Sequence, residues 1–262
     1  MGITGGGILS GMASTPGTLD TQNNQPSKNS GDVNTENFNQ ESLSIIGLYG
    51  AWANSLNENK LPSLSFRRTE FQNLESWKKT ARQRTIERLG IPDIGGIPKL
   101  TVNKVHSYEG LHIEEVSWQL PYGRKTEAIL LKPLNAKGKL PAILAFHDHG
   151  GNKYFGCTKI ARTSDDQHPM MKEHREEYYS NFAWANEIAK RGYVVLVPDA
   201  FTFGSRRVMF QDIPPELRRD QNDENSDTPE KIKNYNDWAG NHEHVIAKSL
   251  FCAGTTWPAV FF

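Results

Sequence analysis

The stretch LPAILAFHDHGGNKYFG, Leu140–Gly156, decides how the rest of this 262-residue chain is interpreted. Its continuous apolar run, Pro141–Phe146, leads directly into two histidines, an aspartate and a pair of glycines. Continuous rather than alternating apolar residues are typical of strands buried on both faces of a parallel sheet. A second such run is Tyr193–Pro198, and the residues between the two predict a helix over Glu173–Arg191 that ends at Gly192. Strand, helix and strand in this order predict a parallel crossover unit.

Upstream of this unit the pattern predicts antiparallel strands and two helices. Strands are expected over Val102–Tyr108, Leu111–Leu120 and Thr126–Leu131, because turn residues separate these runs. Helices are expected over Glu41–Leu56 and Thr69–Leu89, where apolar residues recur at three- and four-residue steps. The sequence therefore predicts an α/β fold in which antiparallel strands precede parallel ones.

The C-terminal part is more polar. Arg207–Lys233 is charged and contains two prolines in succession, which predicts a long surface excursion, either a cover over a functional site or a mobile insertion. Asn234–Phe251 predicts another helix. The final residues, AGTTWPAVFF, are expected to leave their aromatic side chains exposed.

Charge and composition limit the partners. Lys plus Arg and Asp plus Glu are both 30, so the formal net charge is +0, and we expect neither nucleic acid nor a membrane surface as a partner. No apolar run approaches the roughly 20 residues that a membrane helix requires. The two cysteines, Cys157 and Cys252, form no disulfide framework, although a single bridge between them stays open.

The N-terminal residues predict a segment without a core. Residues 1–40 are mostly small and polar and predict a disordered leader, so that the folded domain is expected over residues 41–262. Residues 1–14 resemble the back half of an export signal, in particular the tail of a twin-arginine leader whose arginines would lie upstream. This favours a periplasmic or secreted protein over one with a flexible cytosolic N-terminus.

Three interpretations of the histidines and glycines after the first apolar run were weighed. On an extended backbone His147 and His149 would point the same way and could share a cation, but no residue spacing supplies the third ligand of a catalytic zinc centre. His242 and His244 are equally weak as a pair, so no metal site is predicted. Alternatively, Gly150 and Gly151 simply form a tight turn. In the third interpretation their amide groups turn toward a ligand oxygen, as in an oxyanion hole, where one donor contributes about 3 to 4 kcal/mol to transition-state stabilisation.

Three segments carry a resemblance to a known family. SWKKTARQRTIERLGIP (76–92), LPAILAFHDHGGNK (140–153) and NEIAKRGYVVLVPDAFTFGSRR (186–207) resemble the N-terminal half of α/β-hydrolases of the dienelactone-hydrolase and acetyl-xylan-esterase-like kind. The resemblance covers Phe66–Phe262. It implies an α/β-hydrolase-type sheet and an esterase that acts on a small ester, such as an acyl group on a plant-polysaccharide sugar, with no cofactor.

The resemblance also assigns residues. It places His149, Gly150, Gly151 and Asn152 in the loop that contributes an oxyanion donor. His147, Asp199, Arg206 and Arg207 would lie beside that loop, at the rim of the site or in purely structural roles.

The nucleophile that this chemistry needs has no candidate in the sequence. No serine or cysteine lies at the centre of a G-x-S-x-G-type elbow; Ser205, for example, has Phe203 and Arg207 at the glycine positions. In the family the nucleophile, acid and histidine follow the fourth strand, which would place all three beyond Phe262. We therefore expect a fragment that is inactive alone.

A fragment of this kind is also expected to have an unpaired edge in its sheet. The strand over Pro141–Phe146 would leave buried N–H and C=O groups without partners, so the chain should be poorly stable or be completed by a second chain. The alternative function is a non-catalytic protein that kept the fold and binds a ligand or partner in the same cleft or through the aromatic residues around Trp257 and Phe261.

Overall fold

The computed structural model describes residues 44–56 and 61–261, which fall into two compact units divided after Ser65. The predicted leader over residues 1–40 and its export signal lie outside the described residues. In the first unit a run of turns leads into helix α1 (Tyr49–Ser55). The expected helix was longer, and its residues 41–43 also lie outside the described part. None of the side chains of α1 is buried, so its apolar spacing does not mark a packed face.

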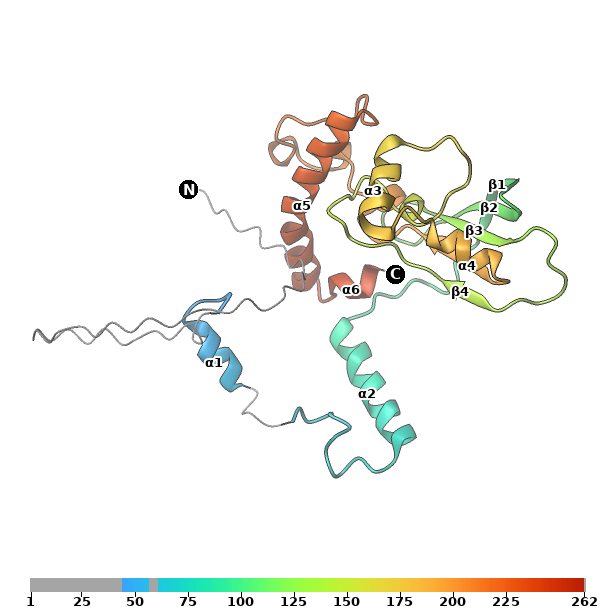
Figure 1. Ribbon diagram of the computed structural model, residues 1–262. Coiled ribbons are helices and arrows are strands. Elements are labelled where there is room, and N and C mark those ends of the chain that lie inside the picture. Colours follow the sequence, from blue (N-terminus) through green and yellow to red (C-terminus); the bar gives the residue numbers. More distant parts are fainter. Residues whose placement is uncertain (1–43, 57–60, 262) are drawn as a thin grey trace, which may run out of the picture. The chain divides into compact units, whose positions relative to one another are not determined.

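The second unit, Phe66–Phe262, contains the sheet and the remaining helices (Figure 1). Its helices and strands are α2 (Leu74–Leu89), β1 (Thr101–Tyr108), β2 (Leu111–Trp118), β3 (Thr126–Pro133), β4 (Ala142–Leu144), α3 (Pro169–Tyr179), α4 (Trp184–Lys190), β5 (Val194–Pro198), α5 (Pro229–Cys252) and α6 (Trp257–Phe261). Short 3-10 turns lie between them: η2 (Cys157–Lys159), η3 (Gly204–Arg206), η4 (Phe210–Asp212) and η5 (Pro215–Leu217). Across residues 44–56 and 61–261, no helix has the length and apolar character needed to cross a bilayer.

The sheet confirms the predicted strands and their directions. Over the described residues its order is β1-β2-β3-β5-β4. The pairs β1–β2, β2–β3 and β3–β5 are antiparallel, and β4–β5 is parallel, with Ala142 opposite Val194. The outcome is a mixed α/β sheet in which a parallel pair follows antiparallel strands, as the sequence predicts.

The prediction that the first apolar run is buried on both faces is wrong. β4 has only three residues, pairs with β5 alone and forms one end of the described sheet. Leu144 is 56% exposed, whereas Ala145, which directly follows the strand, is buried. The continuous apolar pattern here belongs to an edge strand with an exposed leucine, and Leu144 lines an apolar hollow.

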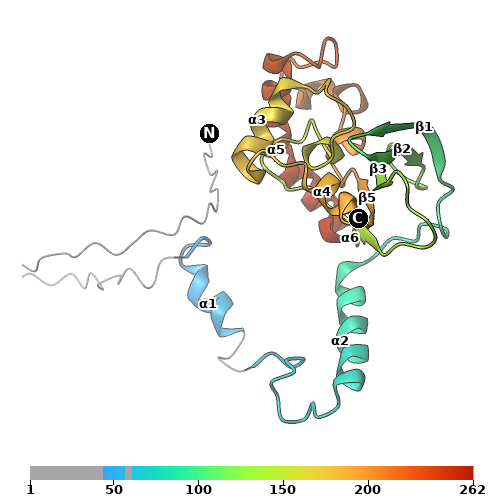
Figure 2. The same cartoon turned by 45° about the vertical axis from the view of Figure 1, so that its right-hand side comes forward.

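The two faces of the sheet differ. On one face Leu131, Val195 and Val197 pack with Ala185 and Ala189 of α4 in the main hydrophobic core. Figure 2 shows α3 and α4 on this side of the strands. The opposite face carries an apolar hollow of about 440 Å³. The hollow is lined by Ile94, Ile97, Pro98, Leu100, Trp118, Leu120, Thr126, Leu144, Phe146, Leu196, Pro198, Asp199, Arg206 and Phe261.

The helix expected over Glu173–Arg191 is two helices. Ser180 and Asn181 both adopt a left-handed backbone, with φ of 50° and 67°, and they separate α3 from α4. The Asn181 amide donates to the Arg175 carbonyl, which closes the end of α3. The second helix, α4, ends at Lys190, and Gly192 (φ 100°), the predicted stop, follows two residues later.

The polar stretch after β5 packs on α5 rather than standing away from the fold. The Asp223 carboxylate accepts hydrogen bonds from the Phe210 and Gln211 amides. The Phe210 ring lies 4.8 Å from the ring of Trp238 in α5. The predicted C-terminal helix is confirmed and begins earlier, at Pro229, where the Thr228 side chain caps it.

The C-terminal aromatic residues are not exposed as expected. Trp257 packs edge-on against Phe201 with a centroid distance of 5.2 Å. The Phe261 carbonyl accepts a hydrogen bond from the Phe201 amide, and Val260 is buried. α6 is therefore held against the segment that follows β5.

Candidate functional site

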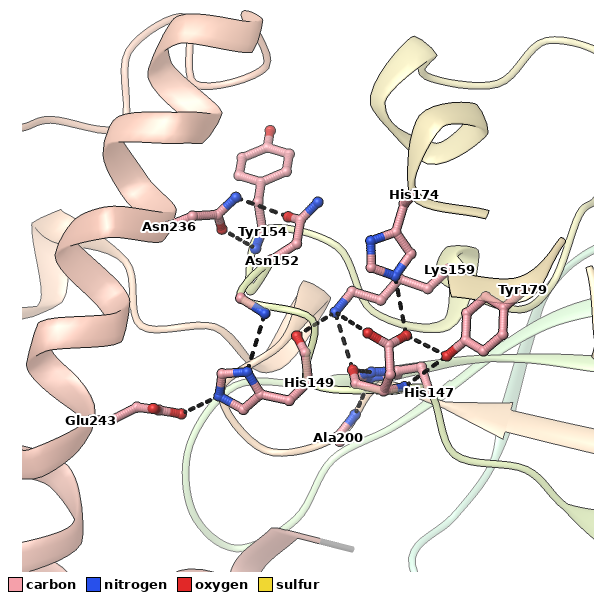
Figure 3. A network of polar contacts seen from close by, with 12 residues as sticks. His147, His149, Asn152, Tyr154, Lys159, His174, Tyr179, Ala200, Asn236 and Glu243 are labelled. Carbon is pink, nitrogen blue, oxygen red and sulfur yellow. Dashed lines mark hydrogen bonds and ion pairs between the residues drawn. The ribbon is translucent and has the colours of Figure 1, made fainter. Parts of the chain in front are cut away.

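The His147–Asn152 loop leaves the sheet just past the carboxyl end of β4, the edge at which ligands bind in open α/β folds. Figure 3 shows it between α3, which carries His174, and α5, which carries Asn236 and Glu243. Side chains from both helices bind the loop, so its backbone is fixed from two sides.

Asp148 ties the loop to α3. Its carboxylate accepts a hydrogen bond from His174 Nε2 at 3.1 Å and another from the Tyr179 hydroxyl. Burial alone would raise the pKa of the Asp148 carboxyl, but the His174 hydrogen bond, the Lys159 charge and the Tyr179 hydroxyl outweigh burial and hold that pKa well below its usual range. Asp148 is therefore a fixed anion in this loop.

His149 and Asn152 tie the other side of the loop to α5. The Gly151 amide donates to His149 Nδ1, so the ring proton is on Nε2, which donates to Glu243 Oε1 at 2.9 Å. Asn236 Nδ2 donates to Asn152 Oδ1 at 2.9 Å. The Asn152 side chain is thus used for anchoring the loop, and one of the two glycine amides predicted to face a ligand bonds within the loop instead.

The two glycines are required for different reasons. Gly150 and Gly151 have φ of 47° and 62°, a backbone that residues with a Cβ rarely adopt. At Gly150 a Cβ would also lie 2.3 Å from Asp148 Oδ1 and 2.7 Å from His174 Cε1, whereas at Gly151 nothing lies within 4 Å. The Gly150 amide has no hydrogen-bond acceptor among residues 44–56 and 61–261.

A buried ammonium group lies against the peptide that carries this amide. Lys159, fully buried, donates from Nζ to the carbonyls of Asp148 at 3.1 Å and His149 at 3.0 Å. The His149 carbonyl and the Gly150 N–H belong to one peptide group, so a cation on the carbonyl strengthens the N–H as a donor. Burial lowers the pKa of Lys159 to about 8, even though Asp148 raises it.

Phe203 is the packing centre beneath the loop. The rings of His147 and His149 lie edge-on to it at 5.0 and 5.4 Å, and the ammonium groups of Lys153 and Lys159 lie 4.1 and 4.7 Å from its centroid. Lys153 also pairs with Glu243 and donates to Thr202. The Phe203 ring therefore contacts two buried ammonium groups, which are attracted to its face.

The geometry of the two histidines does not suit a shared cation. The Ala200 amide donates to His147 Nε2, and His147 Nδ1 donates to the Asp148 carbonyl, so both ring nitrogens of His147 are used. Both ring nitrogens of His149 are also used. In the part of the chain that the structure describes, no group of three His, Cys, Asp or Glu side chains could hold a metal ion.

Asp199, Arg206 and Arg207 take different positions. Asp199 is buried and accepts hydrogen bonds from the Cys157 and Ser205 amides at 2.6 and 2.7 Å. A Cβ at Gly156 or Gly204 would lie within 2.4 Å of its carboxylate, so the backbone encloses this side chain.

The two arginines differ in their burial and in their contacts. Arg206 is buried and donates to the carbonyls of Val260 and Phe261, which fixes α6. Arg207 is half-buried, donates to the Gly204 carbonyl and lies 4.6 Å over the Tyr154 ring, beside a polar hollow of about 450 Å³. Cys157 and Cys252 are free thiols, one buried and one exposed.

The residues that hold the loop were not found from the sequence. They are Lys159, His174, Tyr179, Asn236 and Glu243. Each lies on a helix or turn where a polar residue is ordinary, and their meeting depends on the fold. The only local signal was a lysine, Lys159, between small and apolar residues.

The fold established here is a mixed α/β sheet flanked by helices, consistent with an α/β-hydrolase-like architecture. It is similar to the crystal structure of a proposed acetyl xylan esterase from Bacteroides fragilis NCTC 9343, with a TM-score of 0.53 and 18% sequence identity over 85% of this chain. This chain spans about half of that one, 49% of its length. The chain therefore shares its fold with a structure of the kind that the predicted resemblance names.

Two further structures align with lower scores. A glucuronoyl esterase from Solibacter usitatus aligns with a TM-score of 0.31 and 13% identity, over 68% of this chain and 50% of its own. Acetyl xylan esterase 1 from Thermoanaerobacterium sp. JW/SL YS485 aligns with a TM-score of 0.26 and 15% identity, over 64% and 44%. No protein-family profile matches the sequence, and no curated protein matches it.

Proposed function

We propose that this chain is part of an esterase-type hydrolase and that its His147–Asn152 loop stabilises the tetrahedral oxyanion through the Gly150 amide. The observation that carries the proposal is the Lys159 ammonium on the carbonyl of the same peptide group. A donor fixed before the reaction and polarised by a buried cation is what oxyanion stabilisation requires. The fold shared with a proposed acetyl xylan esterase agrees with this chemistry.

The substrate class and the nucleophile belong to the same proposal. We propose a small or carbohydrate ester as the substrate and a serine nucleophile encoded beyond Phe262. The absence of a G-x-S-x-G elbow in the sequence supports this, as does the 49% of the Bacteroides fragilis structure that the chain covers. We further propose that the mature protein is periplasmic or secreted.

Hydrolysis of p-nitrophenyl acetate tests the assignment. The chain alone should show none, and a polypeptide extended past Phe262 should show it. In the active, extended protein Lys159→Met should lower kcat by about tenfold with little change in KM, because the lost stabilisation exists only in the transition state.

Lys153→Met is the matched control. It removes an equally buried ammonium, which contacts Glu243 and Thr202 but no carbonyl of the loop. Equal losses of kcat in the two variants would contradict the role of Lys159, and an extended protein without activity would contradict the esterase assignment.

A second candidate is a non-catalytic protein that binds a partner chain. The observation that favours it is the apolar hollow of about 440 Å³ beside the edge strand β4, with Leu144 and Ile97 exposed. A second chain could there complete the sheet and cover the hollow. A cooperative, stable monomer in sedimentation would argue against this candidate, and an inactive extended protein with a stoichiometric partner would support it.

A further inference from the structure

A second, smaller hollow of about 170 Å³ lies between α3 and the segment that precedes it. Arg162, Ser164, His168 and Arg175 are among the residues that line it. Its volume is below the roughly 300 Å³ at which pockets for drug-sized ligands begin, so it suits a ligand of only a few atoms. Figure 1 shows α3 and the long connection that leads to it from β4.

Arg175 is the unusual residue of this hollow. Arg175 is only 3% exposed. Its guanidinium donates to the Thr158 carbonyl at 2.9 Å and to the Gln167 side-chain oxygen. No carboxylate of the described residues lies within 4.0 Å of it. A buried cation is ordinarily paired with an acid, because burial without one is costly.

The neighbouring groups do not supply the missing charge. Arg162, which also lines the hollow, is a second cation and already pairs with Asp165 at 2.7 Å. Burial lowers the pKa of the Arg175 guanidinium, and the Arg162 charge lowers it further. Among the lining residues the only acid is Asp166, which is exposed.

The His168 ring makes its hydrogen bonds within the protein. The Met170 amide donates to His168 Nδ1, and His168 Nε2 lies 3.2 Å from the Asp227 carbonyl. Both ring nitrogens of His168 are therefore used within the protein. Among the lining residues, the buried positive charge of Arg175 has no buried acid to balance it.

We propose that this hollow binds a small carboxylate, held by the guanidinium of Arg175 with Arg162 beside it. The planar fork of a guanidinium matches a carboxylate in bidentate geometry. A monoanion, rather than a phosphate dianion, balances the single buried charge of Arg175. The proposal does not depend on the proposed esterase function.

Thermal unfolding of the full chain, followed by circular dichroism, tests the proposal with sodium acetate as the probe. Sodium chloride keeps the ionic strength constant, and sodium phosphate forms a separate arm. Acetate should raise Tm with a saturable dependence on concentration, because a ligand that binds only the folded state stabilises it.

Three variants locate the effect. Arg175→Lys keeps the charge but loses the fork, so the apparent acetate Kd should rise about tenfold. Arg162→Gln, at a half-exposed position, should raise Kd by a smaller factor and serves if Arg175→Lys does not fold. Lys172→Gln removes the same charge from an exposed position of α3 that does not line the hollow, and should leave Kd unchanged.

The outcomes are distinguishable. Saturable stabilisation by acetate that is weakened by Arg162→Gln and untouched by Lys172→Gln supports the site. Equal effects of acetate and chloride, or equal Kd values in all variants, would overturn it. Preferential binding of phosphate would overturn the choice of a monoanion.

Discussion

Replacing Gly150 by alanine tests whether the His147–Asn152 loop and α3 are energetically coupled. The substitution places a Cβ on a backbone with φ of 47°, which costs about 1 to 2 kcal/mol by itself. The same Cβ would lie 2.3 Å from Asp148 Oδ1 and 2.7 Å from His174 Cε1. The Asp148 carboxylate cannot yield without losing its bond to His174, and a hydrogen bond to a charged group contributes about 1.5 to 3 kcal/mol. The expected loss for Gly150→Ala is therefore about 2.5 to 5 kcal/mol.

Gly151→Ala is the matched variant, because φ there is also left-handed, at 62°, while its Cβ would meet nothing within 4 Å. It should cost only about 1 to 2 kcal/mol. Urea unfolding followed by circular dichroism gives both free energies. In a His174→Ala background the excess cost of Gly150→Ala should largely vanish. Equal destabilisation by the two alanines, or an unchanged excess in that background, would refute the coupling.

Three further perturbations follow from other contacts. Arg206→Met removes two hydrogen bonds to α6 carbonyls and should lower the free energy of unfolding by about 3 kcal/mol. Arg207→Met, which loses one bond to the Gly204 carbonyl, should lower it by less than about 1 kcal/mol. Urea titration measures both losses, and equal losses would show that Arg206 does not hold α6. The pKa of Lys159 is lowered from 10.5 to about 8, so between these pH values Lys159 is more protonated in the unfolded chain, and its own contribution to stability should rise with pH over that window. Denaturation at several pH values should show this rise in the difference between the free energies of unfolding of the wild type and of Lys159→Met, and a constant difference would refute it. Leu144→Lys puts a charge at the apolar hollow, so sedimentation velocity should show less self-association than in the wild type, and unchanged association would exclude this face as the contact.

The strands were predictable because their signals are local. Alternating residues and the turn at Glu109 and Gly110 define β1 and β2 nearly to the residue. The helix break at Ser180 and Asn181 was missed because neither residue is a glycine or proline, although asparagine tolerates a left-handed backbone. The edge position of β4 was half anticipated, since its unpaired side was predicted, whereas the predicted burial on both of its faces is wrong.

The candidate site was predictable only in its backbone. The glycine pair after an apolar run marked a loop with unusual dihedral angles, and both glycines have positive φ. The partners of that loop come from α3, η2 and α5, which lie up to 94 residues away in the sequence, as in the contact between His149 and Glu243. Contacts of this length depend on tertiary packing, which residue spacing does not encode. The roles of Arg206 and Arg207 separate for the same reason, because only the fold brings α6 to one of them.

The position of β4 in the sheet has a consequence for biosynthesis. Ala142 of β4 pairs with Val194 of β5, its sheet partner in the described residues. β4 therefore leaves the ribosome about fifty residues before the strand it pairs with. At roughly 5 to 20 residues per second, this apolar segment waits about 3 to 10 s before it can join the sheet. During that interval the nascent chain presents a hydrophobic strand that chaperones recognise, whereas the hairpins of β1, β2 and β3 close as soon as they emerge.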